Sequence, residues 1–273
     1  MGYFTGPDVA ALGRKWHVIT VAAGASILAG ASILAGVVPA SAADAPIRVN
    51  CATADLQAAI NNASPGATLR VTGTCTGTFS IGKSLRLVGQ GAAELNGNDT
   101  SAATVTIGSG ASVRLTSLTI TGGAGGGIRN EGTLTVRGSQ ISGNGSMVAG
   151  GIVNSGTLTL YDSPVSGNGS RFGGPAADGG GIFNTGTVTL HDSAVTGNIS
   201  REGGGIFNTG TATLHDSPVT ANHALVGGGL ANDGSLTLDD SAVADNFAAL
   251  AAGGIRNGGT ATLHDSRGAR RLP

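Results

Sequence analysis

Charged and aromatic side chains are both scarce in this chain of 273 residues, where they make up 11% and 3% of the total. A net charge of −1 gives no general attraction to nucleic acid or to an anionic membrane, and we expect no nucleic-acid partner. The low charge also argues against disorder, which combines high net charge with few β-branched residues. Glycine is abundant instead, with 49 residues, and much glycine with threonine is typical of a β-solenoid.

Cysteine is nearly absent, and the two that occur, Cys51 and Cys75, predict one disulfide in an exported chain. The bridge would close a loop of about 25 residues and stabilise the fold by about 3 kcal/mol. Residues 54–60 lie between the cysteines and place their apolar side chains on one helical face, and Pro65 ends that helix. We interpret residues 43–90 as an N-terminal cap and first coil, in which the short helix covers an open end.

Residues 1–42 have the features of a signal peptide. Arg14 and Lys15 supply a charged start, residues 18–38 are apolar or small throughout, and residues 40–42 match an A-x-A cleavage site. The apolar run is also long enough to span a bilayer. We predict a secreted, extracellular protein, and the alternative is a protein anchored in a membrane by an uncleaved 18–38 segment.

A repeat of about 24 residues fills the C-terminal half of the chain, as in residues 203–222, GGGIFNTGTATLHDSPVTAN. Its first asparagine recurs at spacings of 24, 30, 24, 24 and 25 residues, in the series Asn130, Asn154, Asn184, Asn208, Asn232 and Asn257. A second asparagine follows 14 residues after each of the first five. Units of this length stack as solenoids.

Apolar and polar residues alternate inside each unit, and this period of two indicates strands. Three short strands fit in one unit, separated by Gly, Asn, Asp and Ser. Stacked coils place identical residues above one another, about 4.8 Å apart. The first asparagine of each unit shares its parity with the inward isoleucine before it, so we expect an internal ladder of hydrogen-bonded amides.

The pattern GGGI-x-N-x-GT-x-TL-x-x-S-x-V-x-GN resembles the repeat of secreted right-handed parallel β-helix proteins of the pectin-lyase-like superfamily. It is also similar to the GGAI/FxxN repeats of polymorphic outer-membrane proteins. The resemblance covers roughly residues 46–266 and implies an all-β, right-handed parallel β-helix with repeats over residues 91–266. That fold hosts lyases, hydrolases, adhesins and non-catalytic proteins, so the resemblance is specific for fold and weak for function.

The stack contains about eight coils when the less regular residues 100–123 are included, which corresponds to a length of about 40 Å. The last repeat stops after Ser266, and residues 267–273 form an irregular tail without a recognisable cap. An uncapped coil exposes a strand edge. Three explanations are open, namely a truncated reading frame, which we favour, end-to-end association through the uncapped coil, or a capping partner.

Departures from the repeat mark the candidate binding site. A six-residue insertion lies within residues 169–178, and the outward Phe183 and Phe207 stack next to it. Together with Arg171 and Arg201, these rings are candidates for contacting a sugar or a partner surface. The alternative is that the loop folds over the rings and covers them.

A column of aspartates is the second candidate site, with Asp192, Asp216 and Asp240 at equivalent positions. Carboxylates stacked about 5 Å apart repel one another and recruit cations, so these three are candidate Ca²⁺ ligands. Paired carboxylates also perform acid–base chemistry in glycosidases. A residue present in nearly every coil is more often scaffold, however, and Asp-Ser suits a turn in which the carboxylate bonds to backbone two residues on.

Catalytic motifs of the resembled family are missing. Pectate-lyase relatives use Ca²⁺-binding acidic residues with a catalytic arginine, and polygalacturonase relatives use clustered aspartates with G-H-G and R-I-K motifs. Neither motif occurs in this sequence, and the pair Asp239-Asp240 falls on the repeat columns. We therefore assign no catalytic residue.

Outward threonines are the third feature, because T-x-T recurs in successive units, as at Thr187 and Thr189. Their spacing, about 6.7 Å along a strand and about 4.8 Å between coils, resembles the ice-binding face of some β-helical antifreeze proteins. Threonine also simply favours exposed strand positions.

These observations predict a secreted β-helix protein that binds a polysaccharide or another cell-surface ligand without catalysis, near the loop at 169–178. A polysaccharide lyase or glycoside hydrolase of pectin-lyase-like fold is one alternative. An ice-binding or structural rod is another.

Overall fold

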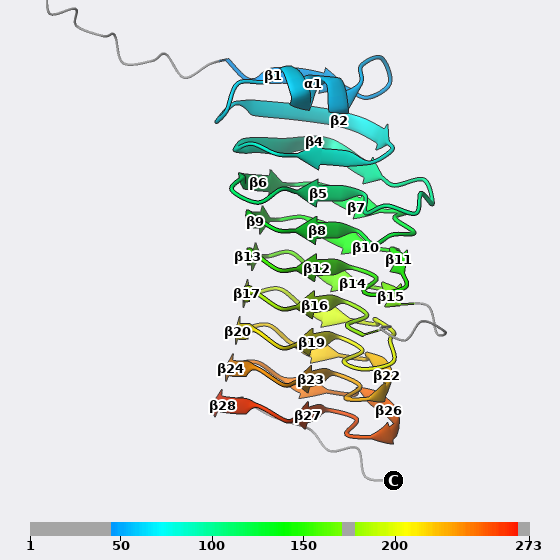
Figure 1. The fold of residues 1–273 in the computed structure, drawn as a ribbon, viewed down its shortest axis with the longest axis vertical. Helices are drawn as coiled ribbons and strands as arrows, with labels where there is room; N and C mark the ends of the chain where they lie inside the picture. The colour runs from blue at the N-terminus through cyan, green and yellow to red at the C-terminus, as the bar shows by residue number, and fades with distance from the viewer. Residues whose placement is uncertain (1–44, 171–177, 267–273) are drawn as a thin grey trace, which may run out of the picture. The chain divides into compact units, whose positions relative to one another are not determined.

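The computed structural model describes residues 45–170 and 178–266. The predicted signal peptide at 1–42, the candidate ligand residue Arg171 and the tail at 267–273 lie outside these ranges. The described residues form one helix and 28 strands, wound into a parallel β-helix with about nine turns (Figure 1). The predicted all-β solenoid with coils of about 24 residues is therefore confirmed.

The N-terminal end carries the predicted helix, α1 (Leu56–Asn62), above the first strands (Figure 1). Asp55 caps this helix, because its carboxylate accepts hydrogen bonds from the backbone N–H groups of Gln57 and Ala58. Leu56 and Ile60 are the buried residues of the helix and join the core of the coils. The predicted disulfide between Cys51 and Cys75 is present and links the turn after β1 (Ile47–Asn50) to β2 (Thr68–Thr76).

Three columns of parallel strands run through the stack. The first column begins with β1, β2 and β4 (Leu85–Asn96) and continues with β6 (Ser112–Thr116), β9 (Thr133–Arg137), β13 (Thr157–Tyr161), β17 (Thr187–His191), β20 (Thr211–His215), β24 (Ser235–Asp239) and β28 (Thr260–His264). The second column consists of β3 (Phe79–Ile81), β5 (Val105–Ile107), β8 (Ile128–Asn130), β12 (Ile152–Asn154), β16 (Ile182–Asn184), β19 (Ile206–Asn208), β23 (Leu230–Asn232) and β27 (Ile255–Asn257).

The third column follows a corner after the first. It consists of the ends of β2 and β4, then β7 (Thr119–Thr121), β10 (Gln140–Ser142), β14 (Val165–Ser166), β18 (Val195–Thr196), β21 (Val219–Thr220) and β25 (Val243–Ala244). Two short pairs lie on the loops between the third and second columns, β11 (Gly145–Ser146) with β15 (Gly169–Ser170), and β22 (His223–Val226) with β26 (Phe247–Ala251). The stack has about nine turns instead of the expected eight, because residues 68–96 wind into coils of their own.

Like residues stack on like, as the repeat predicts. Leu190 pairs with Leu214 and Ile182 with Ile206, and all four side chains are fully buried. The predicted asparagine ladder is also present, since Nδ2 of each first asparagine donates to Oδ1 of the next at 2.7 Å, from Asn130 through Asn257. A central column of hydrogen-bonded amides therefore accompanies the apolar core.

Two further ladders were not predicted. The second asparagines also point inward, and Nδ2 of Asn198 donates to Oδ1 of Asn222 at 3.0 Å. Serines after the aspartate column form the other ladder, in which the backbone N–H of Ser193 donates to Oγ of Ser217 at 3.0 Å. Three ladders in all tie each coil to the next through side chains as well as backbone.

The last described coil exposes side chains that are buried elsewhere. Leu263 of β28 is 47% exposed, whereas Leu238, one coil earlier in the same position, is 1% exposed. End-to-end association through this coil stays a prediction. In the ranges 45–170 and 178–266, no helix has the length and apolar character needed to cross a bilayer.

Candidate functional site

Phe183 and Phe207 lie together, as predicted. They pair in register on β16 and β19, with ring centroids 5.4 Å apart and an interplanar angle of 7°. Their neighbours in the column are Val153 and Ala231. Each ring gives one face to the other, so at most one face of each ring is left for a sugar.

Arg201 is engaged with carboxylates next to the insertion. Its guanidinium lies 3.5 Å from Asp178 and 3.6 Å from Glu202, and the Asp178 side chain is only 14% exposed. Burial raises the pKa of Asp178, and the nearby Arg201 charge opposes that rise in part. Arg201 therefore forms two long ion pairs beside the C-terminal end of the insertion, and it stays a candidate ligand residue.

The aspartate column occupies the corner between the first and third columns. Asp192, Asp216 and Asp240 have φ angles of 49°, 47° and 47°, in the left-handed region. Gly138 (φ 50°) and Ser117 (φ 53°) continue the corner in earlier coils. Aspartate and glycine both tolerate this conformation, which explains why they recur here.

The hydrogen bonds of this corner differ from the expected ones. In the described chain, the carboxylates of Asp192 and Asp216 are exposed and make no hydrogen bond to the backbone two residues on. The following serine satisfies the turn instead, because Oγ of Ser193 donates to the carbonyl of His191 at 2.7 Å. Backbone conformation, together with a buried serine, therefore accounts for the Asp-Ser sequence.

A metal centre is not evident at this column. Within residues 45–170 and 178–266, no group of three or more His, Cys, Asp or Glu side chains is placed to hold a metal ion. The assignment of Asp192, Asp216 and Asp240 as Ca²⁺ ligands stays a prediction.

An outward stack of side chains runs beside the corner. The guanidinium of Arg137 lies 3.7 Å from the Tyr161 ring centroid, and Tyr161 stacks on His191 at 4.7 Å. His191 stacks on His215 at 4.9 Å, and Nδ1 of His215 lies 3.1 Å from Oδ2 of Asp239. The column was visible in the sequence, but its continuous stacking was not predicted.

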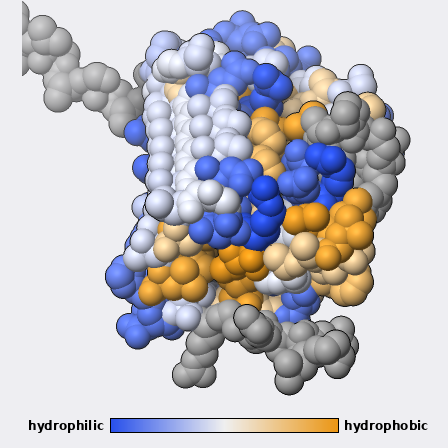
Figure 2. Space-filling view, turned by 60° about the horizontal axis from the view of Figure 1, so that its bottom comes forward, coloured by the Kyte–Doolittle hydropathy of each residue, from blue (hydrophilic) through white to orange (hydrophobic). Residues whose placement is uncertain are grey.

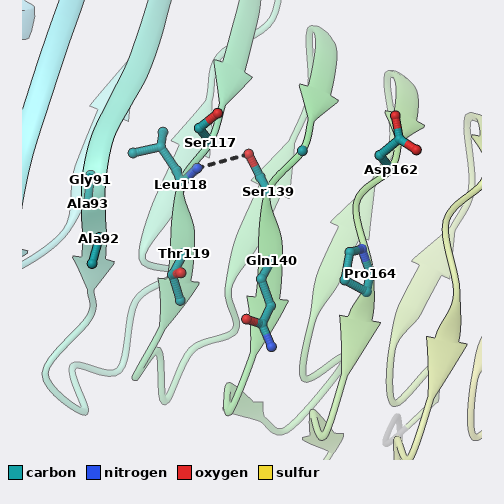
Figure 3. A pocket seen from close by; sticks show the side chains of 11 residues that line it. Gly91, Ala92, Ala93, Ser117, Leu118, Thr119, Ser139, Gln140, Asp162 and Pro164 are labelled. Carbon is teal, nitrogen blue, oxygen red and sulfur yellow. Dashed lines mark hydrogen bonds between the residues drawn. The ribbon is translucent and has the colours of Figure 1, made fainter.

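A groove on the same side was missed by the sequence analysis (Figure 3). It has a volume of about 400 Å³ and crosses four coils, from β4 through β7 and β10 to the segment before β14. Three coil spacings correspond to about 14 Å. Its lining residues are Gly91, Ala92, Ala93, Ser117, Leu118, Thr119, Gly138, Ser139, Gln140, Asp162 and Pro164.

The groove arises from an irregular corner in β4. Val88 pairs with Thr116 of the next coil, and Glu94 pairs with Thr119. Five residues, 89–93, connect the first two positions, whereas only residues 117 and 118 connect their partners. The extra residues form one wall, and the absence of a side chain at Gly138 leaves space beside them. A sequence signal was available, because GQGAA interrupts the strand and glycine replaces the recurring aspartate at 138.

The lining mixes hydrogen-bonding groups with small apolar ones. Thr119, Gln140 and Asp162 supply hydroxyl, amide and carboxylate groups, and Ala92 and Pro164 supply apolar surface (Figure 3). Asp162 is the one ionisable side chain among the lining residues. Such a surface fits a ligand that carries many hydroxyls and little charge.

Comparison with known proteins gave no match, either to a family model or to a curated protein.

Proposed function

We propose that the protein binds an extended, largely uncharged polysaccharide in the groove between Ala92 and Pro164, without altering it chemically. The observation that carries this proposal is the run of the groove across four coils. An open groove of this length suits several successive units of a polymer better than one compact small molecule, which is usually enclosed.

The chemistry of the lining supports the same ligand class. Hydroxyl, amide and carboxylate groups at Thr119, Gln140 and Asp162 can bond to sugar hydroxyls, while Ala92 and Pro164 can contact C–H faces. The disulfide between Cys51 and Cys75 fits an oxidising compartment, where a secreted protein would meet such a polymer.

Binding without turnover is favoured over glycoside hydrolysis. Hydrolysis commonly requires two carboxyl groups on opposite sides of the scissile bond, about 5 to 9.5 Å apart. Asp162 is the one carboxylate among the groove-lining residues. The groove is also favoured over the predicted site beside 169–178, because Phe183 and Phe207 stack on each other.

A glycan array followed by calorimetric titration tests this proposal. Gln140→Trp should fill the groove and raise Kd by about tenfold, equivalent to about 1.4 kcal/mol. Ala194→Trp is the matched control, because Ala194 lies in the same outward column, two coils away and outside the groove lining. We expect that control to bind like the unmodified protein.

Phe183→Ala separates the groove from the predicted aromatic site. If Phe183→Ala abolishes binding while Gln140→Trp has no effect, the ligand lies at the phenylalanine pair and the groove assignment is wrong. Release of oligosaccharides or of unsaturated products from a bound glycan would show an enzyme and overturn the non-catalytic proposal.

A further inference from the structure

A second outward surface carries a regular array of hydroxyl and methyl groups on the first strand column. We call it the threonine face, and it consists of Thr133, Thr135, Thr157, Thr159, Thr187, Thr189, Thr211, Thr213, Ser235, Thr237, Thr260 and Thr262. Regular parallel columns of residues with intermediate hydropathy (white) cover the upper left of Figure 2, on the side where Figure 1 shows β9 to β28.

The array is in register over six coils. Thr157 pairs with Thr187 and Thr187 with Thr211, with no bulge along the column. The inner positions behave alike, since Thr159, Thr189 and Thr213 are partners in the same ladders. The resulting grid repeats at about 4.8 Å between coils and about 6.7 Å along each strand.

The hydroxyls of the central coils are directed to solvent. Thr157, Thr187 and Thr211 are exposed, and their Oγ1 atoms make no hydrogen bond to protein within the described ranges. Each of these hydroxyls can therefore bind water, and the repeating backbone would hold those waters at repeating positions.

The support behind the face keeps the grid rigid. The residues between the threonines, such as Val188 and Leu190, point inward and are fully buried. The asparagine ladder connects the same coils at 2.7 Å per step. A close-packed core with buried hydrogen bonds resists the distortions that would disturb the spacing of the outer atoms.

We infer that the threonine face binds ice. Both grid spacings are close to oxygen–oxygen repeats of hexagonal ice, so waters held by the hydroxyls can join its lattice while the methyl groups lie against it. A lattice is recognised by repetition, and this face offers repetition without a charge on any of its twelve members. A protein partner fits less well, because interfaces usually depend on aromatic or arginine anchors, and the nearest ones, Arg137 and Tyr161 at the edge of the face, are already stacked on each other.

This inference is independent of the groove. The threonine face lies on the outward side of the first strand column, whereas the groove lies at the corner and on the third column, and the two share only the coils of β9 and β13. Loss of glycan binding in Gln140→Trp would therefore leave ice binding intact, and the two proposals can fail separately.

The test measures thermal hysteresis and the inhibition of ice recrystallisation with the purified protein. We expect both activities, and we expect their loss in the double variant Thr187→Tyr/Thr211→Tyr, whose rings project above the grid. Thr196→Tyr/Thr220→Tyr is the matched control, because these threonines are partners on β18 and β21 in the third column. That control should keep the activity of the unmodified protein.

A second variant guards against loss of folding. Thr187→Val/Thr211→Val preserves shape and β propensity while it removes two hydroxyls, and it should reduce hysteresis with an unchanged circular dichroism spectrum. An unmodified protein that behaves like albumin at equal concentration would overturn the inference. Binding to microcrystalline cellulose that is lost in the tyrosine variant, without any hysteresis, would also overturn it in favour of a crystalline glycan.

Discussion

The side-chain Nδ2 of Asn154 donates a hydrogen bond to Oδ1 of Asn184 at 2.7 Å, although 30 residues separate them. Asn184 reaches Asn208 at the same distance across 24 residues. The six-residue insertion therefore does not interrupt the ladder. Long coils are tolerated because the ladder and the strand register, which carry the packing, are the same on both sides of the insertion.

Replacement of Asn184 by alanine should destabilise the protein strongly. Its Nδ2 donates to the carbonyls of Gly186 and Thr211 as well as to Asn208, and the side chain is fully buried. Each buried polar group left without a partner costs about 1–3 kcal/mol, so we expect a loss of at least about 2 kcal/mol in urea unfolding. The exposed Thr187→Ala should cost about 0.5 kcal/mol or less. Equal losses in the two variants would contradict the role of the ladder.

Inward positions within a strand could be predicted from the sequence, because side chains alternate with a period of two. That rule placed the isoleucine columns and the Asn130 to Asn257 ladder correctly. The rule fails across the corner, where a residue with positive φ such as Asp192 turns the chain and resets the alternation. The buried Ser193 and Asn198 follow that corner, and their ladders were missed for this reason.

The candidate site was predictable only in part. The stacking of Phe183 on Phe207 follows directly from the repeat, whereas the groove depends on how residues 89–93 leave the regular coil. The backbone path of this irregular corner could not be inferred from the repeat, because no other described coil has an equivalent segment. The sequence therefore indicated where the coil is interrupted but not the shape that results.

Loss of the disulfide should weaken the N-terminal cap. The bridge from Cys51 to Cys75 ties the end of β1 to β2, and α1 lies within the closed loop. Cys51→Ser/Cys75→Ser should lower the free energy of unfolding by about 3 kcal/mol on the chain-entropy model. Reductant should destabilise the unmodified protein and leave the double variant unchanged. If reductant has no effect on the unmodified protein, the bridge does not contribute to stability.

The buried carboxyl of Asp178 should make stability depend on pH. Burial raises its pKa in the folded protein, so the protonated carboxyl contributes to folding stability. This contribution is fully present below the pKa of the unfolded state, about 4, and it is lost as pH rises through the raised pKa of the folded state. The side chain in Asp178→Asn cannot ionise. We therefore expect the melting temperature of this variant to increase relative to that of the unmodified protein as pH rises from acid to neutral. Arg201→Gln removes the positive charge that opposes the rise in the pKa of Asp178, so stability should fall more steeply with increasing pH in this variant. Parallel melting curves for Asp178→Asn and the unmodified protein at every pH would argue against this effect.

Substitutions at Asp192 can separate a backbone role from a calcium-binding role. Its φ of 49° lies in the left-handed region, where Gly138 stands at the same corner with φ 50°. We expect Asp192→Gly and Asp192→Asn to melt near the unmodified protein, because both residues tolerate this conformation. Asp192→Ala should cost about 1 kcal/mol, because its Cβ meets the steric penalty of that region. The measurement is thermal unfolding of all three variants, with Ca²⁺ and with a chelator. A backbone role predicts that alanine alone destabilises and that Ca²⁺ changes nothing, whereas calcium ligation predicts that Ca²⁺ stabilises the unmodified protein and that all three variants lose this stabilisation.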